Sequence, residues 1–243
     1  MTNKTSVKRN ILFKVLVAIA VAFLVPLSFF VLAKVGKKDK LPMPGYYLKD
    51  GVDSVTVDGK VKYDTLYHHV GDIQLTNQLG RTVSLNKDLK DKILVVNFFF
   101  ARCPSVCPKL SGNMHLLQQA FRKDPKKEFE IGKEIQLVSI TVDPAHDSFP
   151  VLRAYADRYN ADHDKWWFLT GNRDSIYNYA RNELALAVQP TTGGADDFIH
   201  TQKIVILDRE RHVRGYYDGL DTAAVNSCAE DVVKLVLEKG TKK

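Results

Sequence analysis

The sequence has little of what marks several common protein classes. Only 3 of its 243 residues are cysteine, so it is not a small scaffold held together by disulfides. Its 14 glycines and 9 prolines are too few for a fibrous repeat or a linker-dominated chain. Hydrophobic residues make up 45% and charged residues 26%, which is the balance of a globular protein. The length is enough for one large domain or two small ones, so a sizeable core can be buried.

The main body of the chain also lacks a surplus of basic residues. The formal net charge is +7, but 8 of the 35 basic residues and only 1 of the 28 acidic residues fall within the first 40 positions. The rest of the chain therefore holds 27 residues of each sign. A domain that binds nucleic acid needs a basic excess to neutralise phosphates, so we expect no nucleic-acid partner.

One long apolar run lies near the N-terminus, from Val15 to Ala33. Its 19 residues would form a helix of roughly 28 Å, close to the hydrocarbon thickness of a bilayer. The run is longer than the hydrophobic part of a cleaved signal peptide, and no clean small-residue cleavage site follows it. We expect a basic segment over residues 1–14 and an uncleaved transmembrane anchor over 15–35. Basic residues flank both ends, so charge alone does not set the orientation.

The remaining sequence divides into a linker and one α/β domain. Residues 36–65 are rich in glycine, proline and charge, so we expect a linker there. From residue 66 to 243, apolar runs alternate with helical patterns. The runs at 93–100 and 135–142 are nearly continuous, as in strands covered on both faces.

Hydrophobic periodicity and turn residues predict further strands and helices. Residues 72–75 and 82–85 are expected to form a hairpin, and further strands are expected over 166–169, 203–208 and 213–217. Helices are expected over 106–121, 149–159, 174–183 and 222–238. Trp166 and Trp167 are expected to belong to the core.

Two cysteines stand close together in Arg102-Cys103-Pro104-Ser105-Val106-Cys107-Pro108. They follow a buried strand and begin a helix, which is where open α/β sheets place their sites. Four residues apart on one helical turn, the two thiols would face the same way, and the helix N-terminus favours their thiolates. A pair of buried structural thiols is a poor fit to this corner, whereas a metal site and a redox couple both fit. We expect Cys228, on the last helix, to be an ordinary packed thiol.

A metal on this pair needs a third ligand, because two thiolates alone do not complete a copper or zinc site. Seven histidines are available, and two are candidates by position. His146 follows the carboxyl end of the second buried strand, and His200 directly precedes the strand at 203–208. If that strand runs antiparallel to the cysteine strand, both histidines lie at one edge of the sheet. Spacing favours His200 and leaves His146 open.

From about Tyr67 to its end, the chain resembles the Sco/SenC family of copper-handling, thioredoxin-like proteins. It carries the Cys-Pro-x-x-Cys-Pro motif at Cys103–Pro108, the Val-Asp-Pro-x-x-Asp motif with Asp143 and Asp147, and the distal histidine as His200. The resemblance implies a thioredoxin-like mixed sheet with an added N-terminal hairpin and an inserted one, preceded by one transmembrane helix. It further implies that Cys103, Cys107 and His200 bind copper, as Cu(I) or Cu(II), for the CuA centre of cytochrome c oxidase.

The resemblance also implies a location and partners. The expected location is the bacterial inner membrane, with a single pass and the globular domain in the periplasm. The expected partners are the CuA-bearing oxidase subunit and other copper-delivery or thiol-reducing proteins. Asp143 is a candidate partner for the His200 imidazole, because ligating imidazoles usually give their other N–H to a carboxylate or carbonyl. A capping or turn role for Asp143 before Pro144 is the alternative.

Two functions of different class follow. The first is a membrane-anchored copper metallochaperone, and the second is a thiol–disulfide reductase that keeps the cysteines of the oxidase copper site reduced. A sensor of copper or redox state is a third interpretation. Reduction needs only Cys103 and Cys107 as a redox-active pair, whereas copper transfer also needs His200. Thioredoxin-like redox enzymes carry a proline before the strand that faces the cysteines, and here His200-Thr201 stands there instead, which favours the metal role.

Overall fold

A computed structural model describes residues 14, 21–28, 42–57, 60–122, 131–186 and 201–238 of the chain. The chain divides into two compact units, Met1–Pro42 and Met43–Lys243. In the first unit, residues 21–28 are helical. Among the described residues, no helix is long and apolar enough to cross a membrane. The anchor expected over 15–35 falls mostly outside the described residues.

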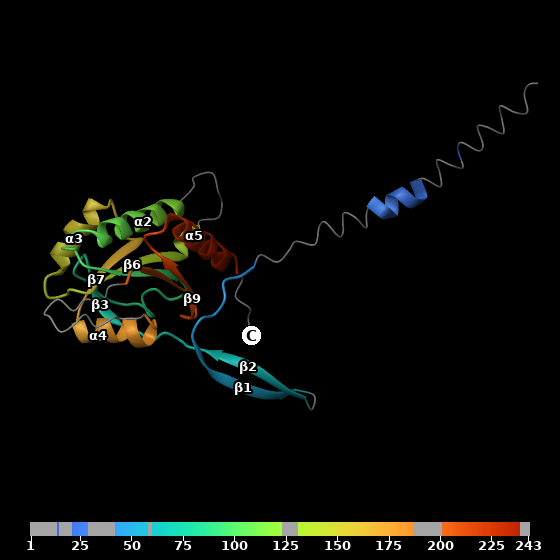
Figure 1. Ribbon diagram of the computed structural model, residues 1–243, viewed down its shortest axis with the longest axis horizontal. Coiled ribbons are helices and arrows are strands. Elements are labelled where there is room, and N and C mark those ends of the chain that lie inside the picture. The colour runs from blue at the N-terminus through green and yellow to red at the C-terminus, as the bar shows by residue number, and fades with distance from the viewer. Residues whose placement is uncertain are drawn as a thin grey trace, which may run out of the picture. The chain divides into compact units, whose positions relative to one another are not determined.

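The second unit is built on a seven-stranded mixed sheet with the strand order β4-β3-β7-β6-β5-β8-β9 (Figure 1). The parallel centre consists of β5 (Ile93–Phe99), β6 (Ile135–Thr141) and β7 (Trp166–Thr170). The antiparallel flanks are β3 (Gln74–Asn77) with β4 (Thr82–Ser84), and β8 (Lys203–Leu207) with β9 (Val213–Asp218). Because β8 runs antiparallel to β5, its start lies at the edge where β5 ends, which meets the condition under which the segment next to His200 reaches that edge.

Helices cover both faces of this sheet (Figure 1). One layer consists of α2 (Val106–Ala120), α3 (Phe149–Arg158) and α5 (Thr222–Leu237), while α4 (Arg173–Asn178) and the π-helical turn η2 (Tyr179–Glu183) lie on the other face. A short 3-10 turn, η1 (Ile131–Lys133), precedes β6. Alternate residues of β5 enter the two cores, Val95 on the side of α2 and Val96 on the side of η2. Double coverage explains why the run at 93–100 is apolar without alternation.

Several packing expectations are confirmed. The β3–β4 hairpin forms where turn residues predict it. Trp166 is fully buried, and its Nε1–H donates to Ser139 Oγ at 2.8 Å. Trp167 is half-buried against the core under η2, and Cys228 is a fully buried thiol.

The segment expected to be a linker over 36–65 contains a second sheet. Here β1 (Lys49–Val57) pairs antiparallel with β2 (Lys60–Tyr67), and the compact unit begins at Met43 rather than at residue 66. The charged composition hides a real signal, because β-branched residues stand on both sides of Asp58-Gly59, at 55–57 and at Val61 and Thr65. Asp-Gly between alternating strands is the strongest short-range indication of a hairpin.

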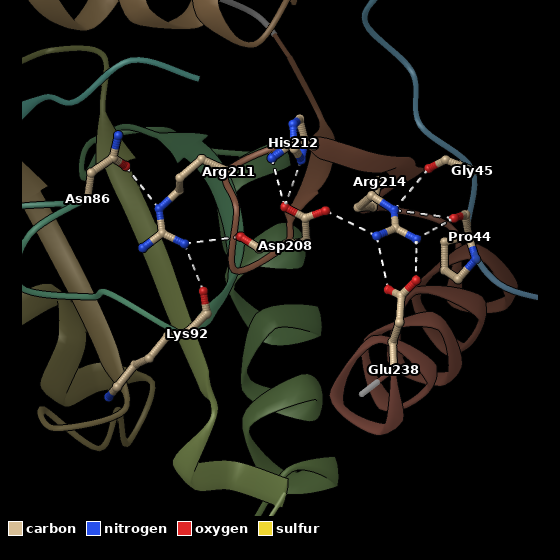
Figure 2. A network of polar contacts seen from close by, with 9 residues as sticks. All are labelled: Pro44, Gly45, Asn86, Lys92, Asp208, Arg211, His212, Arg214 and Glu238. Atoms are coloured by element: carbon tan, nitrogen blue, oxygen red, sulfur yellow. Dashed lines mark hydrogen bonds and ion pairs between the residues drawn. The ribbon is translucent and has the colours of Figure 1, made fainter. Parts of the chain in front are cut away.

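Arg214 holds the start of the second unit against its end (Figure 2). Its Nη1 lies 3.0 Å from Asp208 Oδ2 and 3.0 Å from Glu238 Oε2. Its Nη2 donates to the Pro44 carbonyl at 2.8 Å, and the guanidinium stacks over the Tyr46 ring at 4.1 Å. The chain entering the unit is therefore clamped at residues 44–46, against β9 and the end of α5.

A second buried arginine, Arg211, satisfies main-chain carbonyls of the β4–β5 connection (Figure 2). It donates to the carbonyls of Leu85 at 3.1 Å and Lys92 at 2.8 Å, and to Asn86 Oδ1 at 2.9 Å. Buried backbone carbonyls without hydrogen-bond partners are costly. The Arg211 side chain therefore supplies the hydrogen bonds that a neighbouring strand would otherwise give to this connection. Both arginines stand in the turn and edge strand that follow β8, where polarity alone would indicate solvent exposure.

We expect Arg214→Met to destabilise the second unit by about 3–5 kcal/mol, because it leaves the buried Asp208 carboxylate without its ion pair. The measurement is urea unfolding of the fragment 43–243, which contains both hydrophobic cores. Arg153→Met is the matched control, since the Arg153–Asp157 pair is exposed and its loss should cost at most about 1 kcal/mol. If both substitutions lowered the free energy of unfolding by the same amount, the stabilising role of Arg214 would be contradicted.

Candidate metal centre

The two cysteines lie where β5 passes into α2. Cys103 stands in the connection and is half-buried, whereas Cys107 stands in the first turn of α2 and is buried. The backbone N–H of Cys107 donates to Cys103 Sγ at 3.3 Å, and the Cys103 N–H donates to the Phe100 carbonyl at 3.2 Å. Both cysteines are free thiols. The Cys103 sulfur therefore sits at the N-terminus of α2 and accepts from its unpaired N–H groups.

The two thiols differ in acidity. Partial burial opposes ionisation of Cys103, but hydrogen bonds from the backbone of Cys107, Ser105 and Val106 outweigh it and lower the pKa of the thiol. Burial raises the pKa of Cys107 to about 12. Cys103 is thus the thiol that ionises readily, and Cys107 stays protonated until a metal or a disulfide bond replaces its proton.

A buried carboxylate fixes the corner that carries the pair. Asp147 is fully buried, and its Oδ2 accepts from the Ala101 N–H at 2.9 Å and from the Thr141 hydroxyl at 2.5 Å. Burial raises the pKa of this carboxyl. Because Thr141 ends β6 and Ala101 follows β5, Asp147 joins the ends of two parallel strands. The motif spacing marks Asp147 in the sequence, but its link to Ala101 carries no sequence signal.

Asp143, the other acid of that motif, lies between the guanidinium group of Arg102 and the imidazole of His146. Its Oδ2 is 2.9 Å from Arg102 Nη2, and its Oδ1 is 2.8 Å from His146 Nδ1. Burial alone would raise the pKa of Asp143, but these two partners outweigh it and lower the pKa. The carbonyl of Asp143 also accepts from the His146 and Asp147 N–H groups, as a turn residue does. Sequence reasoning missed the pairing with Arg102 and His146.

A cleft of about 720 Å³ opens beside the cysteines. Its lining includes apolar side chains, the cysteines themselves and the start of β8, namely Phe98, Val106, Leu110, Leu186, Tyr216, Cys103, Cys107, Thr201, Gln202 and Lys203. His200 lies outside the described residues, and Thr201 is its first described neighbour. The pairing of Asp143 with His200 therefore stays a prediction. Within the described ranges, no three His, Cys, Asp or Glu side chains are grouped to hold a metal.

Known proteins share this architecture. The chain matches the model of the SCO1/SenC family over residues 62–237. It is 26% identical over 170 residues to a SCO1 protein homolog of Bacillus subtilis (strain 168), which covers 70% of this chain and 83% of the relative. The solved structure of BsSco, described as a member of the Sco family of cytochrome c oxidase assembly proteins with a disulfide switch, matches with a TM-score of 0.59 and 26% identity over 72% of this chain and 98% of that one.

A further solved structure, Bradyrhizobium japonicum ScoI with copper bound, matches in fold with a TM-score of 0.54. It is 23% identical and covers 68% of this chain and 98% of that one. Together, these likenesses confirm the expected thioredoxin-like mixed sheet.

At pH 7 and in the folded protein, we expect iodoacetamide to modify Cys103 at least tenfold faster than Cys107 or Cys228. The lowered pKa of Cys103 means that more of it is thiolate, and its rate should reach half-maximum below the ordinary thiol pKa of about 8.5. Peptide mass spectrometry measures the three rates, and Cys103→Ser should remove the fast reaction. Faster modification of Cys107 would contradict the assignment.

Proposed function

The chain belongs to the SCO1/SenC family, and on this premise we propose that it is a copper metallochaperone with Cys103, Cys107 and His200 as its ligands. It delivers copper to the CuA site of cytochrome c oxidase. BsSco is a cytochrome c oxidase assembly protein, and ScoI of Bradyrhizobium japonicum carries copper in its solved structure. The first relative supports a role in oxidase assembly, and the second supports copper as the metal.

The observation that carries the proposal is the cysteine pair at the first turn of α2. Its sulfurs are soft ligands of the kind that copper(I) prefers. The N–H groups around Cys103 favour its thiolate, so that one ligand is ready to bind near neutral pH. The raised pKa of Cys107 means that binding must release its proton, which makes copper affinity rise with pH.

An imidazole from His200 would complete this site. Thiolates suit copper(I), and added nitrogen suits copper(II), so two cysteines with one histidine serve both oxidation states. Support comes from Thr201, the neighbour of His200, which lines the cleft together with both cysteines. Loss of the imidazole would leave copper(I) on two sulfurs, open to attack by the thiolates of the oxidase subunit.

We place this activity at the bacterial inner membrane, with a single N-terminal pass and the domain in the periplasm. The apolar run Val15–Ala33 supports the anchor, because it is long enough to span a bilayer. In an oxidising compartment the two thiols would form a disulfide with each other, so copper loading there requires their prior reduction by a thiol-reducing partner.

The unequal acidity of the two thiols also favours a second function, thiol–disulfide exchange. In that reaction the Cys103 thiolate attacks a disulfide of the partner and releases one partner thiol. Cys107 then loses its proton and attacks the Cys103 sulfur, which releases the second partner thiol. The partner gains two electrons, this chain becomes the disulfide, and another reductant must restore it. An accessible thiol of low pKa beside a buried one is typical of this chemistry.

Single substitutions separate the two functions. In His200→Ala we expect copper(II) binding to weaken at least tenfold and its thiolate-to-copper absorption to disappear, while copper(I) stays weakly bound through sulfur. Oxidase assembly should fail in the same variant. Cys103→Ser and Cys107→Ser should lose both copper states. Copper titration followed by absorption, together with oxidase activity of cells that carry each variant, measures these effects.

His146→Ala is the matched control, since it removes an exposed imidazole from the same edge of the sheet. It should leave copper binding unchanged. If His200→Ala keeps copper(II) binding and oxidase assembly while Cys103→Ser loses assembly, the reductase function replaces the chaperone. If His146→Ala shows the loss instead, His146 is the third ligand.

A further inference from the structure

The exposed guanidinium of Arg102 is held in place beside the cysteine pair. Its Nη2 donates to Asp143 Oδ2 at 2.9 Å, and the Asp143 side chain is only 6% exposed. Asp143 is itself fixed, because its backbone N–H donates to Thr141 Oγ1 at 3.0 Å and its Oδ1 lies 2.8 Å from His146 Nδ1. An arginine side chain in water samples many rotamers, so the bond to a buried acid restricts where this guanidinium can lie.

Most of the hydrogen-bonding capacity of Arg102 faces solvent. A guanidinium has five N–H donors and keeps its positive charge throughout the physiological pH range. Among the described residues, Asp143 accepts the only hydrogen bond that Arg102 donates, and the Arg102 side chain is 59% exposed. Because a carboxylate matches the planar fork of a guanidinium, the remaining donors can bind a second carboxylate from outside the chain.

Arg102 lies on one side of the cysteine pair, and the apolar cleft lies on the other. The cysteines follow β5, which stands between β6 and β8 in the sheet. Asp143 follows the end of β6, whereas the cleft reaches Thr201–Lys203 at the start of β8. A molecule that covers the cysteines therefore meets a mainly apolar cleft toward β8 and a held positive charge toward β6.

The segment that carries the cysteines has no acidic residue of its own. From Phe100 to Phe121 it contains Arg102 and Lys109 but neither aspartate nor glutamate. The two acids that follow β6, Asp143 and Asp147, are buried. The surface around the cysteines thus favours an acidic partner and disfavours a basic one.

The recipient of the copper is the partner that must reach this place. Copper passes from Cys103 and Cys107 only when thiolates of the recipient come within bonding distance of the metal, so the groups next to Cys103 face the recipient during transfer. Arg102 directly precedes Cys103 in the chain. Aspartate and glutamate are the side chains of a recipient that are anionic at neutral pH.

We propose that Arg102, held by Asp143, binds a carboxylate of the recipient protein and so keeps the recipient over the cysteine pair. Arg102 is then a residue of the docking surface, and Asp143 is a positioning residue that acts through it. Because the guanidinium is already held, docking costs less side-chain entropy than it would with a mobile arginine. The inference rests on the copper-transfer function proposed above.

Transfer of copper(I) from the full chain to the reduced, copper-free CuA domain of the oxidase subunit tests this role. We expect Arg102→Gln to raise the KM for the recipient at least tenfold with little change in kcat, because the lost contact binds the recipient and does not touch the metal. Asp143→Asn should raise KM less, since the guanidinium remains but is no longer held. Lys109→Gln is the matched control. It removes an exposed positive charge from the same segment and should change KM at most twofold.

Further measurements separate docking from damage to the cysteine site. The copper(I) affinity of each variant, measured by competition with a chromophoric chelator, should stay within twofold of that of the unsubstituted chain. The dependence of KM on ionic strength should become shallower in Arg102→Gln, since salt screens a charge pair at the interface. The double variant Arg102→Gln/Asp143→Asn has no carboxylate left without its arginine, and its KM should equal that of Arg102→Gln alone.

Each contrary result has its own meaning. If the unsubstituted chain passes no copper to the domain, the proposed function fails and the docking role fails with it. If Arg102→Gln transfers copper with an unchanged KM, the docking role alone is wrong. If Arg102→Gln loses copper affinity together with transfer, Arg102 supports the metal site instead of the recipient. A raised KM that keeps its full dependence on ionic strength would show that the contact is not with a carboxylate.

Discussion

The buried carboxylate of Asp147 is the interaction on which the cysteine site depends. A carboxylate out of water is costly unless it is hydrogen-bonded, and Asp147 Oδ2 accepts from the Ala101 N–H and the Thr141 hydroxyl, while Oδ1 is buried without a partner among the described residues. Those two bonds join the ends of β5 and β6. Ala101 stands two residues before Cys103, so the same bonds fix where the connection turns into α2. The N–H groups at the start of α2 then meet the Cys103 sulfur.

The position of the pair at the start of α2 explains why the two thiols differ in acidity. Cys103 lies at the helix N-terminus, partly open to solvent, and ionises readily. Cys107 lies one turn further along, against the core, and keeps its proton. Copper binding and disulfide exchange both begin at an accessible thiolate and both finish at a second sulfur nearby. The pair alone therefore supports either chemistry, and a third ligand decides between them.

Sequence reasoning succeeds where a local pattern of residues determines burial or the direction of neighbouring side chains. The apolar runs of β5 and β6 record burial on both faces, and the Cys103–Cys107 spacing places two sulfurs on one turn. It fails where distant residues meet. Arg102 meets Asp143 across 41 residues of sequence, and Arg214 reaches back to Pro44. The β1–β2 hairpin is a different failure, because the charged residues of its strands suggest a linker although Asp58-Gly59 indicates a hairpin turn.

X-ray absorption at the copper edge of the copper(I)-loaded full chain tests the central claim, that Cys103 and Cys107 jointly hold the cargo, most directly. The spectrum counts sulfur and nitrogen neighbours of the metal without assuming which residues supply them. The account predicts two sulfurs and one nitrogen around each copper, and no copper signal above background when Cys107 is replaced by serine. A coordination shell of nitrogen and oxygen alone, or a Cys107→Ser chain that keeps copper with the same sulfur count, would contradict it.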